Sequence, residues 1–308
     1  MTWQDEIARR VRGEITRGAP LAVRTAIRVG GPADLLVRPR DQDDLASLLR
    51  ACRELGLPLL VLGGGANLLV ADRGVRGVVL KLPREFGEER AEGARLVLSA
   101  GAPTGRLVAQ AQKLGLVACE FVAGIPGTLG GTIAMNAGTR AGEMKDVVQR
   151  VELATAEGAG WVGAAELEFG YRAARIPPGA VVTRVEIELR PGDVTRSAAA
   201  MKADVDHRRA TQPLTQPTFG STFRNPTGAF AGQLIEAVGL KGHRVGGAMW
   251  SDVHANFVVN LGGASARDVL ALMNLARLRV KERFGIVLEP EVRLVGEFGE
   301  GEGIVQLV

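Results

Sequence analysis

Hydrophobic positions in the first half of the chain follow the spacings of alternating helices and strands. Residues 41–56 carry leucines on one face of a helix, with Asp41 placed to cap its start and Gly56 placed to end it. Pro103 opens a second helix whose inner face is also apolar. Short apolar runs of strand length cover 58–62, 77–82 and 95–100. This half of the chain therefore predicts an α/β arrangement.

The pattern changes near the middle of the chain. Between 147 and 189, apolar and polar residues alternate with a period of two, which predicts the strands of a sheet. Turn-forming residues gather at 191–193, directly before a predicted helix over 195–210. We therefore expect a boundary at this point, with one domain over 1–192, itself split into two lobes near residue 75, and a second domain over 193–308.

The second domain has its own predicted elements and a charged cluster in its last strand. A Pro- and Thr-rich loop is expected over 211–220, helices over 229–238 and 265–284, and strands over 255–260 and 286–296. Ser265 and Asp268 predict a capping box at the start of the second helix. In an extended last strand, Glu289, Glu291 and Arg293 would share one face. Charges in an apolar strand are costly unless they are paired or functional, so this cluster is a candidate site.

Composition excludes several classes of function. The 308 residues are 46% hydrophobic and 23% charged, as expected for a globular protein of two or three packed units. The N-terminus is charged and no apolar stretch approaches the ~18 residues of a membrane span, so we expect a cytoplasmic protein without membrane insertion. The three histidines show no metal-ligand spacing, and Cys52 and Cys119 form no CxxC, so neither a metal site nor a disulfide is expected.

The charge distribution bears on possible partners. The net charge of +4 is spread along the chain without blocks of like charge, and aromatic residues make up only 4%. We therefore expect no nucleic-acid partner. Mild basicity suits a phosphate-bearing small molecule, and it also suits a solvated arginine-rich surface.

Two glycine-rich segments are the clearest candidates for a ligand site. They are VLGGGANLLV at 61–70 and GIPGTLGGTIAMNAG at 124–138, and each borders strand-like sequence. Backbone amides without side chains in front of them can approach a pyrophosphate and donate to its oxygens. Neither segment matches the dinucleotide fingerprint or the Walker P-loop. A single glycine run more often marks a turn or tight packing, but the two together favour a phosphate cradle.

Three further motifs carry groups that can do chemistry. Ser221 stands in GSTFRNP at 220–226, Tyr171 and Arg172 stand in FGYRAARIP, and Glu291 stands in LEPEVRLVG. Each has an ordinary structural explanation as well: a turn serine, a solvated arginine, or a glutamate in an ion pair. Taken singly, none of these motifs identifies an active site.

Together and in this order, the segments resemble the UDP-N-acetylenolpyruvoylglucosamine reductase (MurB) family of bacterial peptidoglycan synthesis. The resemblance includes AGQLIEAVGLKG at 231–242 and HANFVVN at 254–260, and it covers nearly the whole chain. It implies an α+β fold, with an FAD-binding domain of the vanillyl-alcohol oxidase type followed by a C-terminal α/β substrate-binding domain. It also implies bound FAD, NADPH as the hydride donor and a UDP-sugar enolpyruvyl substrate. The short connection after Asn225 resembles the shorter subtype of the family.

The resemblance also implies the residues of the site. Ser221 would be the proton donor, and Arg172 and Glu291 would act as catalytic residues on the carboxylate of the substrate. Further substrate contacts would come from Tyr171, Asn225 and His254. FAD would be held by Gly63, Gly64, Gly65, Ala66, Asn67, Leu68, Gly124, Ile125, Pro126, Gly127, Thr128, Gly130, Gly131, Asn136 and Gly138.

These residue types suit the implied reaction. Hydride addition to an enolpyruvyl double bond leaves negative charge that spreads into the carboxylate. Arg172 can bind both carboxylate oxygens in a fork, and Ser221 can pass a proton to the second carbon. Glu291 either donates a hydrogen bond as a protonated acid or orients Arg172, and the sequence leaves both roles open.

One position departs from the family pattern, and two other functions are to be weighed. Thr211 stands where members often have lysine, and Arg209 is a candidate to replace that phosphate contact. An oxidase of the same flavin fold would use oxygen as its acceptor, but the serine, Tyr-Arg and LEPE motifs argue against it. A flavin-binding protein without catalysis would not need all three catalytic positions. We expect a monomer.

Overall fold

The computed structural model describes residues 2–300 and 302–306, and these fall into two compact units. Unit 1 takes the described residues of Met1–Arg17, Leu35–Gly64 and Gly77–Asp206, and unit 2 takes those of Gly18–Asp34, Gly65–Arg76 and His207–Val308. The chain therefore passes between the units repeatedly rather than once. These limits are not those of the expected domains, 1–192 and 193–308, whose separate functions stay a prediction.

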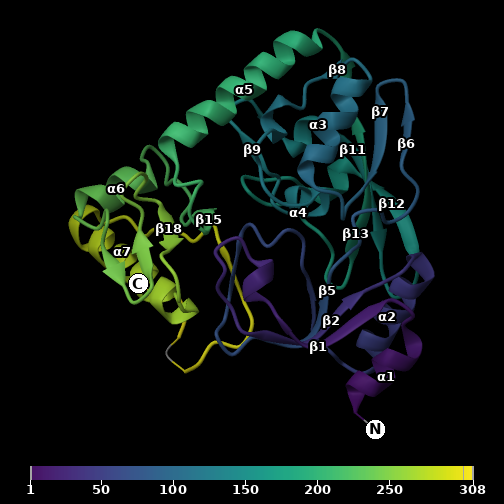
Figure 1. Cartoon of the computed structure of the whole chain (residues 1–308), viewed down its shortest axis with the longest axis horizontal. Coiled ribbons are helices and arrows are strands. Elements are labelled where there is room, and N and C mark those ends of the chain that lie inside the picture. Colours follow the sequence, from purple (N-terminus) through teal and green to yellow (C-terminus); the bar gives the residue numbers. More distant parts are fainter. Residues whose placement is uncertain (1, 301, 307–308) are drawn as a thin grey trace. The chain divides into compact units, whose positions relative to one another are not determined.

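The main sheet of unit 1 is antiparallel and has the strand order β12-β11-β13-β7-β6 (Figure 1). Two helices, α3 (Thr104–Lys113) and α4 (Leu129–Ala134), share a buried core with it, to which they contribute Leu107 and Ile133. The strands are Ala159–Gly163 (β12), Val148–Ala154 (β11), Val181–Glu188 (β13), Arg95–Ser99 (β7) and Arg90–Glu92 (β6). The alternating pattern between 147 and 189 thus forms sheet strands, as predicted.

A second core in unit 1 surrounds α2 (Gln42–Glu54), which packs against α1 (Trp3–Arg10). Asp41 accepts a hydrogen bond from the Asp44 N–H at 2.9 Å, and Gly56 follows the helix with φ of 62°. Both ends of the predicted helix are therefore confirmed. The helix begins after an aspartate cap and ends before a glycine in the left-handed conformation, as predicted. A four-stranded sheet has the order β1 (Glu14–Pro20), β2 (Pro32–Arg38), β5 (Val75–Leu80) and β3 (Leu59–Val61).

Short elements complete unit 1. Two antiparallel pairs join β8 (Leu116–Val117) to β14 (Arg190–Pro191), and β9 (Gly138–Thr139) to β10 (Gly142–Glu143). The 3-10 helices of this unit are Glu120–Val122, Met144–Asp146 and Ala164–Leu167. The thiols of Cys52 and Cys119 are free and buried, and burial raises their pKa values to about 11 and about 12.

Unit 2 is built on an antiparallel sheet with the order β15-β18-β17-β16, of which Figure 1 labels β15 and β18. Its core includes Trp250, which is fully buried, and takes in both α6 and α7. The predicted capping box of α7 is present, because Ser265 and Asp268 exchange hydrogen bonds with each other's backbone N–H groups. The elements are β15 (Thr218–Ser221), α6 (Ala231–Ala237), β16 (Arg244–Val245), β17 (Ala248–Trp250), β18 (Phe257–Asn260) and α7 (Ala266–Phe284).

Four further elements lie in unit 2 or lead into it. The long helix α5 (Val194–Thr211) contains the last passage between the units, and a 3-10 helix covers Ala22–Arg24. β4 (Leu68–Val70) pairs in parallel with β19 (Arg293–Val295), so that Leu68 stands opposite Arg293. This pairing joins the end of the first glycine segment to the end of the LEPE segment.

Two predictions about unit 2 are wrong. The strand expected over 286–296 is limited to β19, and the residues before it are irregular apart from a single bridge between Pro290 and Phe223. Glu289 is exposed and Glu291 is half-buried, so the face that these residues were expected to share does not form. The loop expected over 211–220 contains the start of β15, because Thr218 pairs with Val259 in β18.

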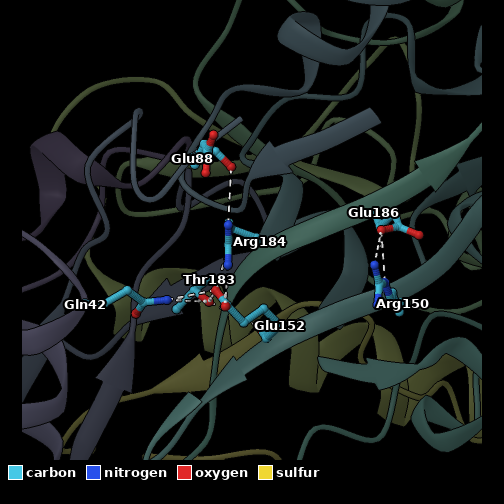
Figure 2. Close-up of polar contacts among 7 residues, drawn as sticks. All are labelled: Gln42, Glu88, Arg150, Glu152, Thr183, Arg184 and Glu186. Atoms are coloured by element: carbon cyan, nitrogen blue, oxygen red, sulfur yellow. Dashed lines mark hydrogen bonds and ion pairs between the residues drawn. The ribbon is translucent and has the colours of Figure 1, made fainter. Parts of the chain in front are cut away.

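A polar cluster on the main sheet of unit 1 explains why some polar residues of its strands are buried (Figure 2). The Glu152 carboxylate accepts hydrogen bonds from Arg184 at 2.6 and 2.9 Å, from the Thr183 hydroxyl at 2.6 Å and from the Gln42 amide at 2.8 Å. Because Gln42 opens α2, the cluster ties that helix to the sheet. In the same view Arg150 donates two hydrogen bonds to Glu186.

Candidate active site

The two glycine segments meet within unit 1. A Cβ atom on Gly64 would lie 2.5 Å from the Cα of Gly127, and one on Gly63 would lie 2.7 Å from the Thr128 hydroxyl oxygen. Gly127 also has φ of 125°, and Gly124 has φ of 72°, conformations that favour glycine. The close approach therefore requires Gly64 to lack a side chain, and the backbone conformation of Gly127 favours glycine at that position.

The loop at 63–66 offers hydrogen-bond donors for an anion. Among the residues that the structure describes, the backbone N–H groups of Gly64, Gly65 and Ala66 donate to no protein acceptor. The Lys81 ammonium donates to the Gly63 carbonyl oxygen at 2.8 Å and places a cation at the start of the loop. Small residues whose backbone N–H groups have no protein acceptor can donate hydrogen bonds to the oxygens of a pyrophosphate group. Lys81 was missed from the sequence, because an isolated lysine in a strand pattern carries no signal.

A cavity of about 490 Å³ follows the second glycine segment. It is lined on one side by Gly124, Ile125 and Pro126 and on the other by α3, with Thr104, Val108 and Gln112. The Thr104 hydroxyl donates to the Ile125 carbonyl oxygen at 2.6 Å, which fixes the segment against the start of the helix. Three of the predicted cofactor residues therefore border a space large enough for part of a ligand.

Other predicted cofactor residues have packing reasons of their own. Gly130 lies inside α4, where a Cβ would come within 3.1 Å of the Ala100 Cβ, and its N–H donates to the Ala100 carbonyl oxygen at 2.8 Å. The Gly131 N–H donates to the Thr128 side chain, the cap of α4. A Cβ on Gly138 would lie 2.4 Å from the Gly142 carbonyl oxygen across the β9–β10 pair.

The rest of the first glycine segment lies in unit 2. Gly65 is buried with φ of 65°, and its carbonyl oxygen accepts from the Ala26 N–H at 2.9 Å. A Cβ there would lie 2.1 Å from the Arg24 carbonyl oxygen. Asn67 and Leu68 follow, with Leu68 at the start of β4. Gly65 is therefore required by its own packing, whatever it binds.

Tyr171 and Arg172 form the tip of a tight turn in unit 1. Gly170 and Ala173 close the turn with reciprocal backbone hydrogen bonds of 2.9 and 3.3 Å. Tyr171 is 55% exposed, and the Arg172 guanidinium carbon lies 5.4 Å from the centroid of its ring. Arg172 has φ of 56°, an unusual backbone conformation for an arginine.

In unit 2, Thr222, the residue after Ser221, links the serine segment to the backbone of Glu291. Ser221 ends β15 next to Gly220, whose φ is 85° and whose position carries an irregularity in the β15–β18 pairing. The carbonyl oxygen of Thr222 accepts from the Glu291 N–H at 2.9 Å, and the Thr222 N–H donates to the Asn256 carbonyl oxygen at 2.8 Å. The serine segment therefore runs between β18 and the LEPE segment.

Two asparagines fix this arrangement, and sequence reasoning gave neither of them this role. Asn256 is 3% exposed, and its side chain accepts from the Phe223 N–H at 3.0 Å and donates to the Phe223 carbonyl oxygen at 2.8 Å. Asn67 donates from Nδ2 to the Glu291 carbonyl oxygen at 3.0 Å, and its own carbonyl oxygen accepts from the Arg293 N–H at 3.1 Å. Local sequence predicts neither set of contacts, because each joins residues that are far apart in the chain.

The predicted substrate contacts Asn225 and His254 lie near the start of α6. The Asn225 Oδ1 accepts from the Ala231 N–H at 3.0 Å, and a Cβ on Gly232 would lie 3.0 Å from the His254 ring. The His254 Nδ1 accepts from the Asn256 N–H at 3.2 Å, so the neutral ring carries its proton on Nε2. Burial lowers the pKa of His254, which keeps this ring neutral near pH 7.

Comparison with known proteins identifies the family of this chain. The family model described as "UDP-N-acetylenolpyruvoylglucosamine reductase, C-terminal domain" matches 212–295, and the model "FAD binding domain" matches 33–161. The UDP-N-acetylenolpyruvoylglucosamine reductase of Anaeromyxobacter sp. (strain Fw109-5) is 73% identical, over 96% of this chain and 93% of its own length. The chain belongs to the UDP-N-acetylenolpyruvoylglucosamine reductase family.

More distant members agree in sequence and in structure. The reductase of the same name from Myxococcus xanthus (strain DK1622) is 52% identical over 92% of this chain and 93% of its own length. The crystal structure of the enzyme (MurB) from Thermus caldophilus superposes with a TM-score of 0.78 at 39% identity, over 92% of this chain and 99% of that one. The expected α+β fold, an FAD-binding domain followed by the reductase C-terminal domain, is confirmed. The chain is an FAD-containing oxidoreductase of this family.

Among the described residues, no helix is long and apolar enough to span a bilayer. The same part of the chain holds no group of three or more His, Cys, Asp or Glu side chains arranged to bind a metal ion.

Proposed function

We propose that this chain reduces the enolpyruvyl group of UDP-N-acetylglucosamine enolpyruvate to give UDP-N-acetylmuramate, with NADPH reducing the bound FAD, in peptidoglycan biosynthesis. The observation that carries the proposal is the backbone hydrogen bond between Thr222 and Glu291. It attaches the segment that contains Ser221 to the segment that contains the LEPE motif. Membership of the reductase family supports the proposed identity of the substrate. We further propose that the protein works as a cytoplasmic monomer.

The residues that would hold FAD are those around the Gly64–Gly127 approach. Backbone amides at 64–66 would donate to the pyrophosphate, and the glycines leave room for it. The bound flavin would supply hydride to the double bond of the substrate. The residues of the chain have the remaining tasks: they bind and orient the substrate, stabilise the charge that develops on it and deliver a proton.

Arg172 is the proposed stabiliser of that charge. Hydride addition turns the carboxylate of the substrate into part of an enolate-like system that carries additional negative charge. A preorganised cation at such a position is worth about 3–4 kcal/mol of transition-state stabilisation when comparable donors are removed from other enzymes. The tight turn at 170–173 provides the preorganisation, because it determines the backbone from which the guanidinium extends.

Ser221 is the proposed proton donor to the second carbon. A serine hydroxyl is a weak acid, so this role requires neighbours that hold it in place and that return its proton. The irregularity at Gly220 and the hydrogen bonds of Thr222 determine the backbone on which Ser221 stands. Glu291 would either donate a hydrogen bond to the same charge or orient Arg172, and its backbone is held on both sides.

The remaining contacts would bind the UDP-sugar part of the substrate. Because Asn225 uses Oδ1 to accept from Ala231, its Nδ2 is the group that would reach a ligand. His254 would donate from Nε2, and Tyr171 would offer an exposed ring. The Thr211 hydroxyl donates to the His207 carbonyl oxygen at 2.9 Å inside α5, so Arg209 is the better candidate for the phosphate contact that lysine makes in other members.

The test is to follow the two half-reactions separately without oxygen. Reduction of the bound flavin by NADPH should be faster than by NADH, and the reduced enzyme should be reoxidised by UDP-N-acetylglucosamine enolpyruvate with formation of UDP-N-acetylmuramate, identified by mass. Air-saturated buffer is the comparison. Faster reoxidation by oxygen than by the enolpyruvyl substrate would indicate an oxidase and contradict the proposal.

A further inference from the structure

The backbone of Arg172 stands in a conformation that arginine rarely adopts. Its φ of 56° is left-handed, a conformation in which the Cβ crowds the following carbonyl oxygen. Such a conformation persists only where the surroundings hold it in place. The reciprocal hydrogen bonds of Gly170 and Ala173 close the turn, but they do not attach it to the rest of unit 1.

Asn136 provides that attachment. Its Nδ2 donates to the Gly170 carbonyl oxygen at 3.0 Å and to the Glu143 carboxylate at 2.9 Å. Its Oδ1 accepts from the Lys145 N–H at 3.0 Å. An asparagine amide has two N–H donors, and here both are used within the protein. The Asn136 side chain thus joins the 170–173 turn to the 143–145 segment.

Burial and backbone conformation both indicate that the role of Asn136 is to join the 170–173 turn to the 143–145 segment. The residue is 0% exposed, so a bound flavin could contact it only after the surrounding chain had moved. Its φ is 38°, a left-handed value that asparagine tolerates better than most residues. Glu143 is itself ion-paired with Lys145, and its backbone N–H donates to the Asp146 carboxylate at 2.8 Å, so this partner of Asn136 is held in place as well.

We propose that Asn136 is a positioning residue for Arg172, acting through the Gly170 carbonyl oxygen, and not a ligand of the flavin as the sequence suggested. The inference rests on the proposed function, in which Arg172 meets the charge that develops on the substrate. A misplacement of about 1 Å at such a group can cost on the order of 100-fold in rate. Loss of the Asn136 contact should therefore slow the step that needs Arg172 and leave the other step unchanged.

The variant that tests this is Asn136→Asp. It keeps the oxygen that accepts from Lys145, but it removes both donors and places a second carboxylate beside Glu143. FAD content and the rate of flavin reduction by NADPH should stay within about twofold of wild type, while flavin reoxidation by the enolpyruvyl substrate should slow on the order of 100-fold. Protonation of the introduced carboxyl restores one donor, so the slow step should recover as the pH is lowered, unlike that of the wild type.

A double-variant cycle separates action through Arg172 from action elsewhere. If Asn136 works only by placing Arg172, Asn136→Asp combined with Arg172→Ala should be no slower than Arg172→Ala alone. Asn136→Gly is the second variant, because glycine keeps the left-handed backbone and removes every side-chain contact. It should show the same selective loss without the recovery at low pH.

Asn260→Asp is the matched control. Asn260 is also buried, at 8% exposed, and it also joins separate segments, by donating to the Ile27 carbonyl oxygen at 3.0 Å and accepting from the Gly262 N–H at 2.8 Å. It lies outside the proposed site. This variant should lower the midpoint of thermal unfolding and leave both half-reactions unchanged, as expected for a purely structural asparagine.

The outcomes distinguish failure of the inference from failure of the proposed function. Normal reoxidation in Asn136→Asp and Asn136→Gly, with a slow Arg172→Ala, overturns the positioning role alone. Loss of FAD from the Asn136 variants, or slowing that adds to that of Arg172→Ala, also overturns it and favours a role at the cofactor. Normal reoxidation in Arg172→Ala overturns both the inference and the proposed role of Arg172.

Discussion

The side chain of Asn67 donates a hydrogen bond to the backbone carbonyl oxygen of Glu291 at 3.0 Å. The Glu291 N–H donates in the opposite direction, to the Thr222 carbonyl oxygen at 2.9 Å. Both sides of the Glu291 backbone are therefore held within unit 2, although the segment is irregular rather than a strand. A glutamate whose backbone is held in this way has little conformational freedom left to lose when it acts.

Glu291→Ala should keep FAD and the fold but lose at least ~100-fold in kcat, because in the proposed mechanism the carboxyl group acts on charge that develops only after hydride transfer. The backbone contacts to Asn67 and Thr222 do not depend on the side chain. Glu289→Ala is the control, since Glu289 is exposed and stands two residues away in the same motif. Steady-state kinetics and the flavin spectrum of both variants provide the measurement. Near-normal turnover in Glu291→Ala would make Glu291 a structural residue.

Ser221→Ala should leave flavin reduction by NADPH intact and slow flavin reoxidation by the substrate at least ~100-fold, the usual size of lost general acid catalysis. Stopped-flow absorbance follows each half-reaction. Ser221→Cys retains an acidic proton and should recover part of the rate. If Ser221→Ala slows both halves equally or neither, Ser221 is a turn residue, and another group delivers the proton.

Gly64→Val should abolish flavin retention, because its side chain would start 2.5 Å from the Gly127 Cα and would occupy the space in front of the loop amides. Gly160→Val is the matched control: a Cβ at Gly160 in β12 meets nothing within 4 Å. Flavin absorbance per mole of purified protein and the unfolding temperature are the two readouts. A folded, fully yellow Gly64→Val protein would show that the loop does not hold the cofactor.

Glu152→Gln should lower the free energy of unfolding by about 3 kcal/mol at neutral pH, since it leaves Arg184 without its charged partner in a largely buried cluster. Glu186→Gln is the control. Its partner Arg150 has 41% of its side chain exposed, so the expected loss is about 1 kcal/mol or less. Urea unfolding of both variants measures the difference.

The loss in Glu152→Gln should depend on pH. Burial raises the pKa of Glu152, but hydrogen bonds from Arg184 and Thr183 outweigh burial, and the pKa lies below the ordinary value of 4.5. A lowered carboxyl pKa gives stability that is fully present above the unfolded-state pKa and is lost as the pH falls through the folded-state pKa. The difference between wild type and Glu152→Gln should therefore be constant at neutral pH and shrink below about pH 4.5. A difference that grows in acid would contradict the ion-pair assignment.

Features that depend on near neighbours in the chain were available from the sequence. The start of α2 at Asp41, its end at Gly56 and the capping box at Ser265 each need only a few consecutive residues, so each was predicted and is present. The order of motifs was also sufficient to indicate the family, because it needs no knowledge of how the chain folds.

Tertiary structure decided the features that depend on distant partners. Whether the LEPE segment forms a strand depends on Asn67 and Thr222, which stand far from it in the sequence and hold its backbone in an irregular form. The resemblance implies that Asn136 contacts the cofactor, and this stays a prediction; in the folded chain its side-chain amide donates to Gly170 and Glu143. A side-chain amide can bond to any backbone that folding brings to it, and local sequence does not specify which one. The sequence by itself thus determined which residue types and which local conformations were present. The tertiary structure decided which backbone groups the side chains bind, because folding brings those distant groups together.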